Sequence, residues 1–223
     1  MNPSARAIVI SSHEPNAPAL NKLLESLRPQ CQGKIDIVVV IGGCAWDEPL
    51  SIHESGMYFE LRCMHNSFEY TALIELLHRD LAWDRYFLLH DTCVAGDTCV
   101  DKILEACPDN EECTVSFNFP SMNIGWYSTK TLNMHKTWLE SMKCTDPGLL
   151  HVAKSRAVDF EDYVFKRQHQ KGMHRFLGRV TCVSGPTDYY GTGVDRVVEY
   201  YASLDVYKIK ANWYVRDVYQ LSM

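Results

Sequence analysis

The chain has 223 residues, of which 46% are hydrophobic and 22% are charged, and its formal net charge is −6. This composition is typical of a globular protein, and it excludes an intrinsically disordered chain, a collagen and a miniprotein that depends on disulfides. The net negative charge argues against a general nucleic-acid-binding surface, so we expect no nucleic-acid partner.

The nine cysteines are scattered, and no two of them form a Cys-x-x-Cys pair. A zinc ribbon needs such pairs, and an odd number does not suit a disulfide framework. The first residues lack a basic segment before a long apolar core, and no run approaches the roughly 18 apolar residues of a membrane span. We therefore expect reduced cysteines, a cytoplasmic location and no membrane span. Cys93, close after His90 and Asp91, leaves open the alternative of a cysteine nucleophile.

In the first half of the chain, β-branched runs alternate with segments of helical periodicity. The predicted strands are 6–11, 34–41, 57–63 and 86–89, and the predicted helices are 20–27 (ended by Pro29), 66–81 and 98–107. This alternation predicts an α/β domain with a mainly parallel sheet. Ligands bind at the carboxyl ends of such strands, which places segments 11–14, 42–43 and 90–97 around one crevice.

The second half continues with predicted strands at 114–119, 123–129 and 180–183, and with predicted helices at 131–143, 160–169 and 195–201. No repeat, low-complexity segment or linker interrupts the chain, so a single domain over residues 1–223 is the simplest partition. Three common classes of α/β protein lack their signatures here. The G-x-G-x-x-G of dinucleotide-binding proteins, the G-x-x-x-x-G-K-[ST] of P-loop proteins and the G-x-S-x-G of α/β-hydrolases are all absent.

A polar cluster, HDTCVAGD, directly follows the predicted strand 86–89. An aspartate delivered to a loop by a buried strand is suited to hold Mg²⁺ or Mn²⁺ and to bridge it to substrate phosphates. Asp91 is therefore a candidate ligand. The alternative is that Asp91 caps a turn, although Asp97, just before a predicted helix, fits a capping role better.

A second cluster, FEDYVF, opens the predicted helix 160–169. Glu161 or Asp162 is a candidate general base for an acceptor hydroxyl, and the alternative is that both carboxylates stabilise the helix start. The stretch 154–179 around this cluster has seven basic and three acidic residues, so it is either an anion site or a solvated helix face. His169 and His174 lie within it and are candidates for binding metal or phosphate.

Taken together, the segments AIVISSHEPN, HNSFEY, YFLLHDT and FED, with a histidine downstream, resemble the nucleotide-sugar glycosyltransferases of the A-type fold. The resemblance spans about residues 6–175. It implies a single-domain, Rossmann-like α/β/α sandwich with a mainly parallel central sheet. The nucleotide-binding half would be about 1–110, and the acceptor and catalytic half about 111–223.

The resemblance also implies roles for individual residues. The nucleotide and donor sugar would contact Ser11, Ser12, His13, Gly43, Asn66, His90 and Asp91. In the position of the family's Asp-x-Asp, His90-Asp91-Thr92 offers one carboxylate, and Asp91 with His169 or His174 would hold Mn²⁺ or Mg²⁺. Alternatively, the basic stretch 154–179 would neutralise the diphosphate in place of a metal.

The activity implied is transfer of a sugar, of the hexosyltransferase type, from a nucleotide-diphosphate donor to the hydroxyl of a glycan or another acceptor. Asp162 would be the base, with Glu161 as its neighbour or substitute, and direct displacement would invert the anomeric carbon. Two alternatives stay open. One is a nucleotidyltransferase, although SSHEPNAP lacks the glycine and basic residues usual in its first loop. The other is a domain that binds a sugar nucleotide without turnover.

Overall fold

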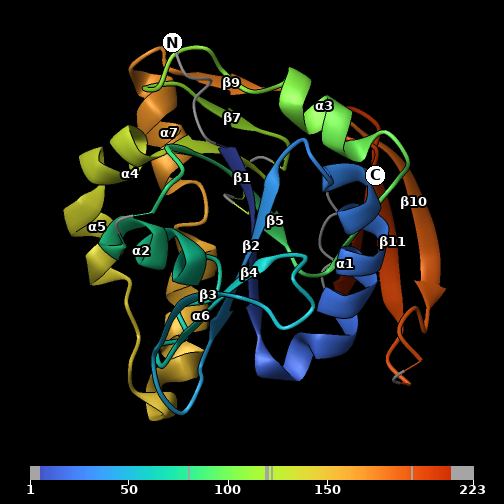
Figure 1. Cartoon of the computed structure of the whole chain (residues 1–223), viewed down its shortest axis with the longest axis horizontal. Helices are drawn as coiled ribbons and strands as arrows, with labels where there is room; N and C mark the ends of the chain where they lie inside the picture. Colours follow the sequence, from blue (N-terminus) through green and yellow to red (C-terminus); the bar gives the residue numbers. More distant parts are fainter. Residues whose placement is uncertain (1–5, 80, 119–120, 122, 192, 212–223) are drawn as a thin grey trace, which may run out of the picture.

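The computed structural model describes residues 6–79, 81–118, 121, 123–191 and 193–211, and Figure 1 shows how its elements are arranged. The strands are β1 (Arg6–His13), β2 (Asp36–Gly42), β3 (Glu48–Ile52), β4 (Phe59–Cys63), β5 (Arg85–His90), β6 (Cys93–Ala95), β7 (Thr114–Ser116), β8 (Gly125–Ser128), β9 (His174–Phe176), β10 (Val180–Thr187), β11 (Arg196–Tyr201) and β12 (Val206–Ala211). The α-helices are α1 (Ala17–Cys31), α2 (Tyr70–His78), α3 (Cys99–Glu105), α4 (Thr129–Met134), α5 (Lys136–Ser141), α6 (Leu150–Asp159) and α7 (Tyr163–Gln170). Short 3-10 helices span Glu14–Asn16 and Pro147–Leu149.

The large sheet has eight strands in the order β3-β4-β2-β1-β5-β8-β7-β9. Strands β4, β2, β1 and β5 run parallel, which confirms the expected mixed α/β fold with a mostly parallel central sheet. Since β5 and β7 are both antiparallel to β8, they point the same way. The carboxyl ends of β1, β2, β5 and β7 therefore lie along one side of the sheet, which we call the carboxyl edge.

Both faces of the large sheet are covered, because residues along each strand alternate between two apolar clusters. Ile8 and Ile10 of β1 face the cluster that includes the buried leucines of α1, whereas Ala7 and Val9 face the cluster formed with α2. In Figure 1, α1 and α3 lie on one side of the sheet, and α2, α4 and α5 lie on the other. Packing on both faces holds strands β1, β2 and β5 in place, and the ends of these strands carry the polar residues of the carboxyl edge.

A second, antiparallel sheet has the order β10-β11-β12-β6. Its strand β6 begins two residues after Asp91, and β12 pairs with β6 in the register Lys208 opposite Cys93. The C-terminal strands are thus tied directly to the segment that follows β5, so the second sheet brings residues of the chain's last described strands to the carboxyl edge.

The expected elements are confirmed over most of the chain, with these corrections. The expected helix 131–143 is two shorter helices, α4 and α5, and the expected helix 160–169 begins only at Tyr163, so FED lies before α7. The segment 195–201 is not a helix but contains β11, because its β-branched and aromatic residues pair with both β10 and β12. Pro29 does not end the first helix, since α1 continues to Cys31 with Pro29 in its last turn. Among the described residues, no helix is both long and apolar enough to cross a membrane.

Candidate functional site

Asp91 is fully buried at the carboxyl edge, directly after β5. The hydroxyl of Ser12, near the end of β1, donates to Oδ2 of Asp91 at 2.8 Å, and Nδ2 of Asn16 donates to the same oxygen at 3.0 Å. The other oxygen, Oδ1, lies 2.8 Å from Nδ1 of His90, within ion-pair distance, and no other described residue donates a hydrogen bond to it. Asp91 therefore has one oxygen fixed by β1 and the following turn, and one that can accept from a ligand.

The electrostatics of this group favour a charged carboxylate. Burial alone would raise the pKa of Asp91, but the ring of His90 and the hydrogen bonds from Ser12 and Asn16 hold it below its ordinary value. The pKa of His13 is lowered, first by burial and then by the charges of His90 and Lys154, with Asp91 acting in the opposite direction. His13, His90 and Asp91 thus form one interacting group.

The structure also brings Gly43 and Asn66 together beside the end of β2. Gly43 has φ +79°, its N–H donates to the carbonyl of His65 at 3.0 Å, and a Cβ at this position would lie 3.5 Å from the Cβ of Asn66. Oδ1 of Asn66 accepts from the N–H of Phe68 at 3.1 Å. Ser11 at the end of β1 reaches the same loop, because its hydroxyl donates to the carbonyl of Phe68 at 3.4 Å.

Glu161 and Asp162 lie in different surroundings between α6 and α7. The hydroxyl of Tyr70, at the start of α2, donates to the carbonyl of Phe160 at 2.7 Å and so fixes this junction. Burial raises the pKa of Glu161, the charge of Glu69 adds to the increase, and Lys208 and a hydrogen bond with Ser121 oppose it. Asp162 instead sits before α7 with its carboxylate 3.9 Å from Nζ of Lys166.

A polar network covers the same edge from the second sheet. Nζ of the buried Lys208 donates to Oδ1 of Asn123 at 2.9 Å, and Nδ2 of Asn118 donates to that oxygen at 3.0 Å. The hydroxyl of Tyr201 lies 2.7 Å from Oδ1 of Asn118 and 2.8 Å from Oε2 of Glu199. The segment between β7 and β8, which carries both asparagines, is thereby connected to β11 and β12.

His169 and His174 do not lie with Asp91, contrary to the expectation for a metal site. His174 begins β9, opposite Thr114 at the start of β7, and therefore sits on the side of the sheet away from the carboxyl edge. Its Nδ1 lies 2.8 Å from the hydroxyl of Thr114, and its Nε2 lies 3.0 Å from that of Ser116. His169 is its neighbour, with ring centroids 6.3 Å apart. Burial lowers the pKa of His174 to about 4, so this histidine is a neutral, hydrogen-bonded part of the sheet.

The described residues at the carboxyl edge offer a divalent metal one carboxylate oxygen, because Ser12 and Asn16 bind the other oxygen of Asp91. A magnesium ion is usually held by one or two carboxylates together with substrate phosphates, so Asp91 alone would be the smallest such set. Among the described residues, the group with three possible ligand atoms within 4.8 Å of one another is Cys63, His65 and Glu75, and it does not include Asp91. We therefore derive no step of the chemistry through a metal.

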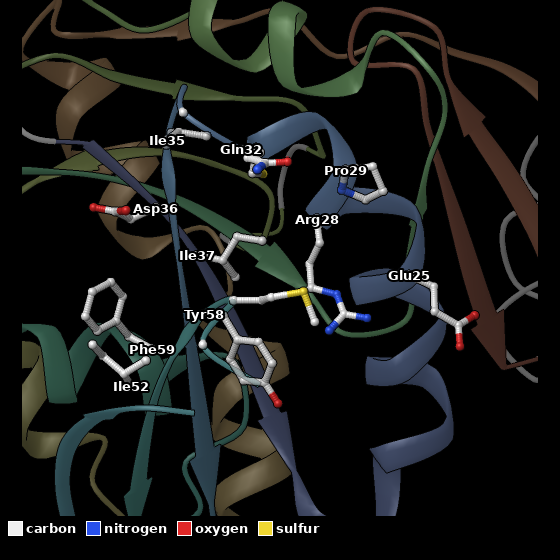
Figure 2. Close-up of a pocket in the computed structure, with 14 residues that line it drawn as sticks. Glu25, Arg28, Pro29, Gln32, Ile35, Asp36, Ile37, Ile52, Tyr58 and Phe59 are labelled. Carbon is white, nitrogen blue, oxygen red and sulfur yellow. The ribbon is translucent and has the colours of Figure 1, made fainter. Parts of the chain in front are cut away.

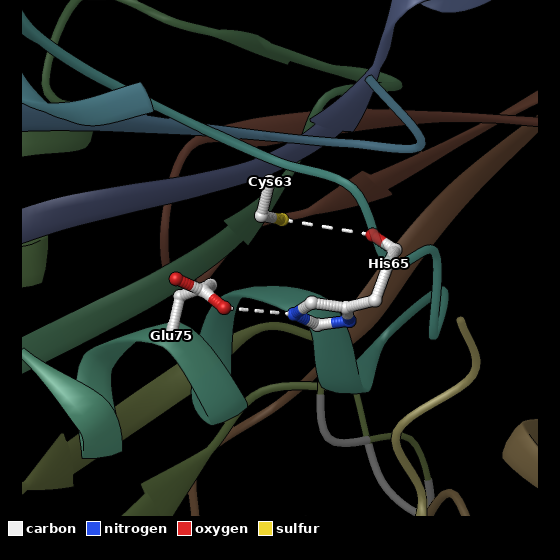
Figure 3. Close-up of side chains that lie close together, drawn as sticks. All are labelled: Cys63, His65 and Glu75. Carbon is white, nitrogen blue, oxygen red and sulfur yellow. Dashed lines mark hydrogen bonds and ion pairs between the residues drawn. The ribbon is translucent and has the colours of Figure 1, made fainter. Parts of the chain in front are cut away.

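Cys63, His65 and Glu75 form a buried group under the carboxyl edge (Figure 3). Nε2 of His65 lies 2.9 Å from Oε1 of Glu75, Nδ1 of His65 lies 3.0 Å from the hydroxyl of Ser67, and Arg79 pairs with Oε2 of Glu75 at 3.0 Å. The ring nitrogens of His65 and both oxygens of Glu75 are thus occupied by protein partners. Burial raises the pKa of the Cys63 thiol, which opposes the thiolate that a metal needs. The group is a structural network that holds the loop carrying Asn66.

Replacing His65 by leucine is expected to lower the free energy of unfolding by about 3–5 kcal/mol, because it leaves the buried carboxylate of Glu75 without one of its two partners. Urea denaturation measures this difference. The matched control is Lys34→Met, which removes an exposed ion pair with Asp101 and should cost less than about 1 kcal/mol. A loss below about 1 kcal/mol for His65→Leu would contradict a structural role.

The exposure of side chains decides two further questions, whether Cys93 is a nucleophile and whether segment 154–179 is an anion site. Cys93 is completely buried, and burial raises its pKa to about 12, so it is not a reactive thiolate. The seven basic side chains of segment 154–179 are exposed (Lys154, Arg156, Lys166, Arg167, Lys171, Arg175 and Arg179). This exposure favours the solvated-face interpretation, although Lys154 does act on His13.

A pocket of about 690 Å³ lies away from the carboxyl edge (Figure 2). It is lined by Arg28 of α1, by Asp36 at the start of β2 and by Phe59 at the start of β4, together with Ile52 and Tyr58. Because these strand residues are at the amino ends, the pocket opens at the opposite side of the sheet from Asp91. It shares none of the residues expected to bind a nucleotide.

No protein-family model matches the chain, and no curated protein matches it. Among solved structures, the glycosyltransferase GlyE of Streptococcus pneumoniae TIGR4 superimposes with a TM-score of 0.50 at 12% sequence identity. The chain has a glycosyltransferase-like fold. The match covers 78% of this chain and 45% of GlyE, and the apo form of GlyE gives a TM-score of 0.47 at 11% identity with the same coverage. The chain thus spans less than half the length of GlyE, and at this identity the likeness concerns the fold alone.

Sequence reasoning did not identify the polar network of Asn118, Asn123, Glu199 and Tyr201. It also missed Asn16, Glu69 and Lys208. Asn16 belongs to the quoted segment AIVISSHEPN, and Glu69 belongs to HNSFEY, so each stood next to a recognised residue. Lys208 lies in a β-branched and aromatic tail that has no motif, and its place depends on the pairing of β12 with β6. The alternation in VYKIK was the one available signal, since it predicts a strand.

Proposed function

We propose that the chain is a glycosyltransferase that moves a sugar from a nucleotide-diphosphate donor to an acceptor hydroxyl. The observation that supports this most directly is that a buried carboxylate, Asp91, and a carboxyl group with a raised pKa, Glu161, lie at the same edge of a glycosyltransferase-like fold. Two acidic groups whose surroundings shift their pKa values in opposite directions are suited to different roles in one reaction.

Asp91 and the end of β1 are proposed to hold the nucleotide. Oδ1 of Asp91 would accept a hydrogen bond from a ribose hydroxyl, while Ser12 and Asn16 keep the carboxylate oriented. Gly43 has φ +79°, a conformation in which a side chain is strained. Because glycine has no side chain, the backbone at this position can also approach the ligand closely. His13, His90 and Asn66 lie at the same edge, and we propose that they contact the nucleotide, as the family resemblance implies.

Glu161 is proposed as the base, in preference to Asp162. It removes the proton of the acceptor hydroxyl as the hydroxyl oxygen attacks the anomeric carbon, and the electrons of the carbon–oxygen bond to the donor pass to the departing diphosphate. This direct displacement inverts the anomeric carbon. Its raised pKa suits proton abstraction better than the carboxylate of Asp162, which lies 3.9 Å from the ammonium group of Lys166.

The activity is tested by incubating the chain with a panel of nucleotide-diphosphate sugars and measuring the nucleotide products by chromatography. A transferase releases the nucleoside diphosphate slowly by transfer of the sugar to water, and faster when an acceptor is present. In a parallel incubation with a nucleoside triphosphate and a sugar 1-phosphate, release of pyrophosphate would instead identify a nucleotidyltransferase, and absence of any product in both incubations would identify a binding domain. Either of these two outcomes would contradict the proposal.

Replacing Glu69 by glutamine is expected to shift the acidic limb of the pH–kcat/KM profile to lower pH. Transfer needs ionised Glu161, so the rate rises with pH through the pKa of that group. The charge of Glu69 is one cause of the raised pKa, and its removal lowers the pKa. The exposed Glu105→Gln is the control and should leave the limb in place. An unmoved limb, or one at higher pH, in Glu69→Gln would refute the assignment.

A further inference from the structure

Lys208 occupies a position next to the proposed nucleotide site. It lies on β12 opposite Cys93 of β6, and the N–H of the next residue, Ile209, donates to the carbonyl of Thr92 at 2.8 Å. These two contacts place the strand that carries Lys208 against the segment that immediately follows Asp91. The charge of Lys208 also acts on Glu161, so its ammonium group lies within electrostatic range of the proposed base.

The ammonium group of Lys208 is buried without an ion pair. The residue is 6% exposed, and the hydrogen bond to Oδ1 of Asn123 is the one that the described residues give to its Nζ. None of the described carboxylates pairs with it. Glu199, which is nearby, pairs with Lys210 at 2.8 Å and accepts from Tyr201. Two of the three N–H donors of Lys208 therefore remain for a ligand.

A buried cation without an anion is costly, and proteins rarely retain a lysine in this state. Burial lowers the pKa of Lys208, and an anionic ligand would reverse that effect. At the carboxyl edge, Asp91 is the buried carboxylate that the described residues offer to a divalent metal. Lys208, from the second sheet, is a buried positive group already fixed beside it.

We propose that Lys208 binds the diphosphate of the donor and does so in place of a divalent metal. The inference rests on the proposed function, since the diphosphate is that of a nucleotide sugar. As the bond between the anomeric carbon and the diphosphate breaks, negative charge grows on the departing phosphate oxygen. A fixed ammonium group at that oxygen stabilises the charge, and the effect is larger in a site that excludes water.

The test is calorimetric titration of the whole chain with inorganic pyrophosphate in buffer containing EDTA. The wild-type chain should bind pyrophosphate, and Lys208→Met should weaken the affinity by about 10- to 100-fold, the range for loss of a hydrogen bond to a charged group. The matched control is Lys102→Met, because Lys102 likewise bonds to a neutral oxygen, the carbonyl of Ala202, but lies on α3 away from the site. It should leave the affinity unchanged.

The inference is overturned if Lys208→Met binds pyrophosphate as tightly as the wild type, or if the wild type binds it only after Mn²⁺ is added. The second criterion needs no variant, so it applies even if Lys208→Met does not fold. Turnover of nucleotide sugars that requires Mn²⁺ would remove this inference and leave the proposed function standing. If pyrophosphate binding depends on Lys208 but the chain turns over no donor, the anion site at Lys208 stands and the proposed function is refuted.

Discussion

Replacing Glu161 by glutamine is expected to slow sugar transfer by about 10²- to 10⁴-fold, the usual contribution of a general base. Glutamine keeps the size of the side chain and the hydrogen bond with Ser121 but cannot take a proton. Donor binding should stay near normal, because the base acts on the acceptor hydroxyl. The measurements are kcat for transfer at saturating donor and the dissociation constant of the nucleoside diphosphate.

Asp162→Asn is the matched control for this prediction. It changes the adjacent carboxylate, which lies 3.9 Å from Nζ of Lys166 near the helix surface. We expect transfer within about a factor of three of the wild type and a loss of stability of no more than about 1 kcal/mol. Equal and small effects of the two substitutions would show that neither carboxylate is the base. A large effect of Asp162→Asn alone would assign the base to Asp162.

Replacing Asp91 by asparagine is expected to lower kcat/KM for the donor by about 10²-fold. The carboxylate accepts hydrogen bonds from Ser12 and Asn16 through one oxygen, and we propose that the other accepts from the ribose. An amide must place a donor at one of these two positions, and loss of a hydrogen bond to a charged group costs about 1.5–3 kcal/mol. Steady-state kinetics with varied donor concentration measure the change.

The control for Asp91→Asn is Asp97→Asn, an exposed aspartate six residues further along the chain. It should leave kcat/KM unchanged. Melting temperatures of both variants show whether the fold is retained, since a general loss of structure would lower activity for another reason. A folded Asp91→Asn variant with a near-normal kcat/KM would return Asp91 to a role in capping the turn after β5.

The nucleotide side of the candidate site could be predicted from the sequence because it depends on parallel strands. Buried β-branched runs identify β1, β2 and β5, and the carboxyl ends of parallel neighbours meet at one edge. This reasoning brought Ser12 and Asp91 together although they are 79 residues apart in the chain. The hydrogen bond itself follows from the structure, in which β1 lies beside β5 with Ser11 opposite His90.

The second sheet could not be predicted in the same way, because its pairing of β12 with β6 joins segments more than 100 residues apart. The segment that forms β11 has few residues and both charged and apolar positions, so periodicity does not separate a strand from a helix there. Its partners β10 and β12 decide the matter, and β12 in turn places Lys208. Because the segment around Lys208 has no recognisable motif, the sequence does not predict that this lysine is buried.

The positions of His169 and His174 could not be predicted for a different reason. The order of motifs along the chain put His169 and His174 after the acidic pair, but order does not say on which side of the sheet a residue lies. The antiparallel β8 makes β7 point the same way as β5, and β9 pairs with the start of β7. His174 is therefore at the amino ends of these strands, away from Asp91.

A crystal structure with a bound nucleoside diphosphate tests the central claim most directly. The nucleoside diphosphate to use is the one that raises the melting temperature of the chain most. The account predicts that a ribose hydroxyl contacts Oδ1 of Asp91 and that the outer phosphate contacts Nζ of Lys208. Glu161 should lie across from this phosphate, with the space for the sugar between them. A nucleotide bound elsewhere, as in the pocket between Arg28 and Tyr58 at the opposite side of the sheet, would contradict it.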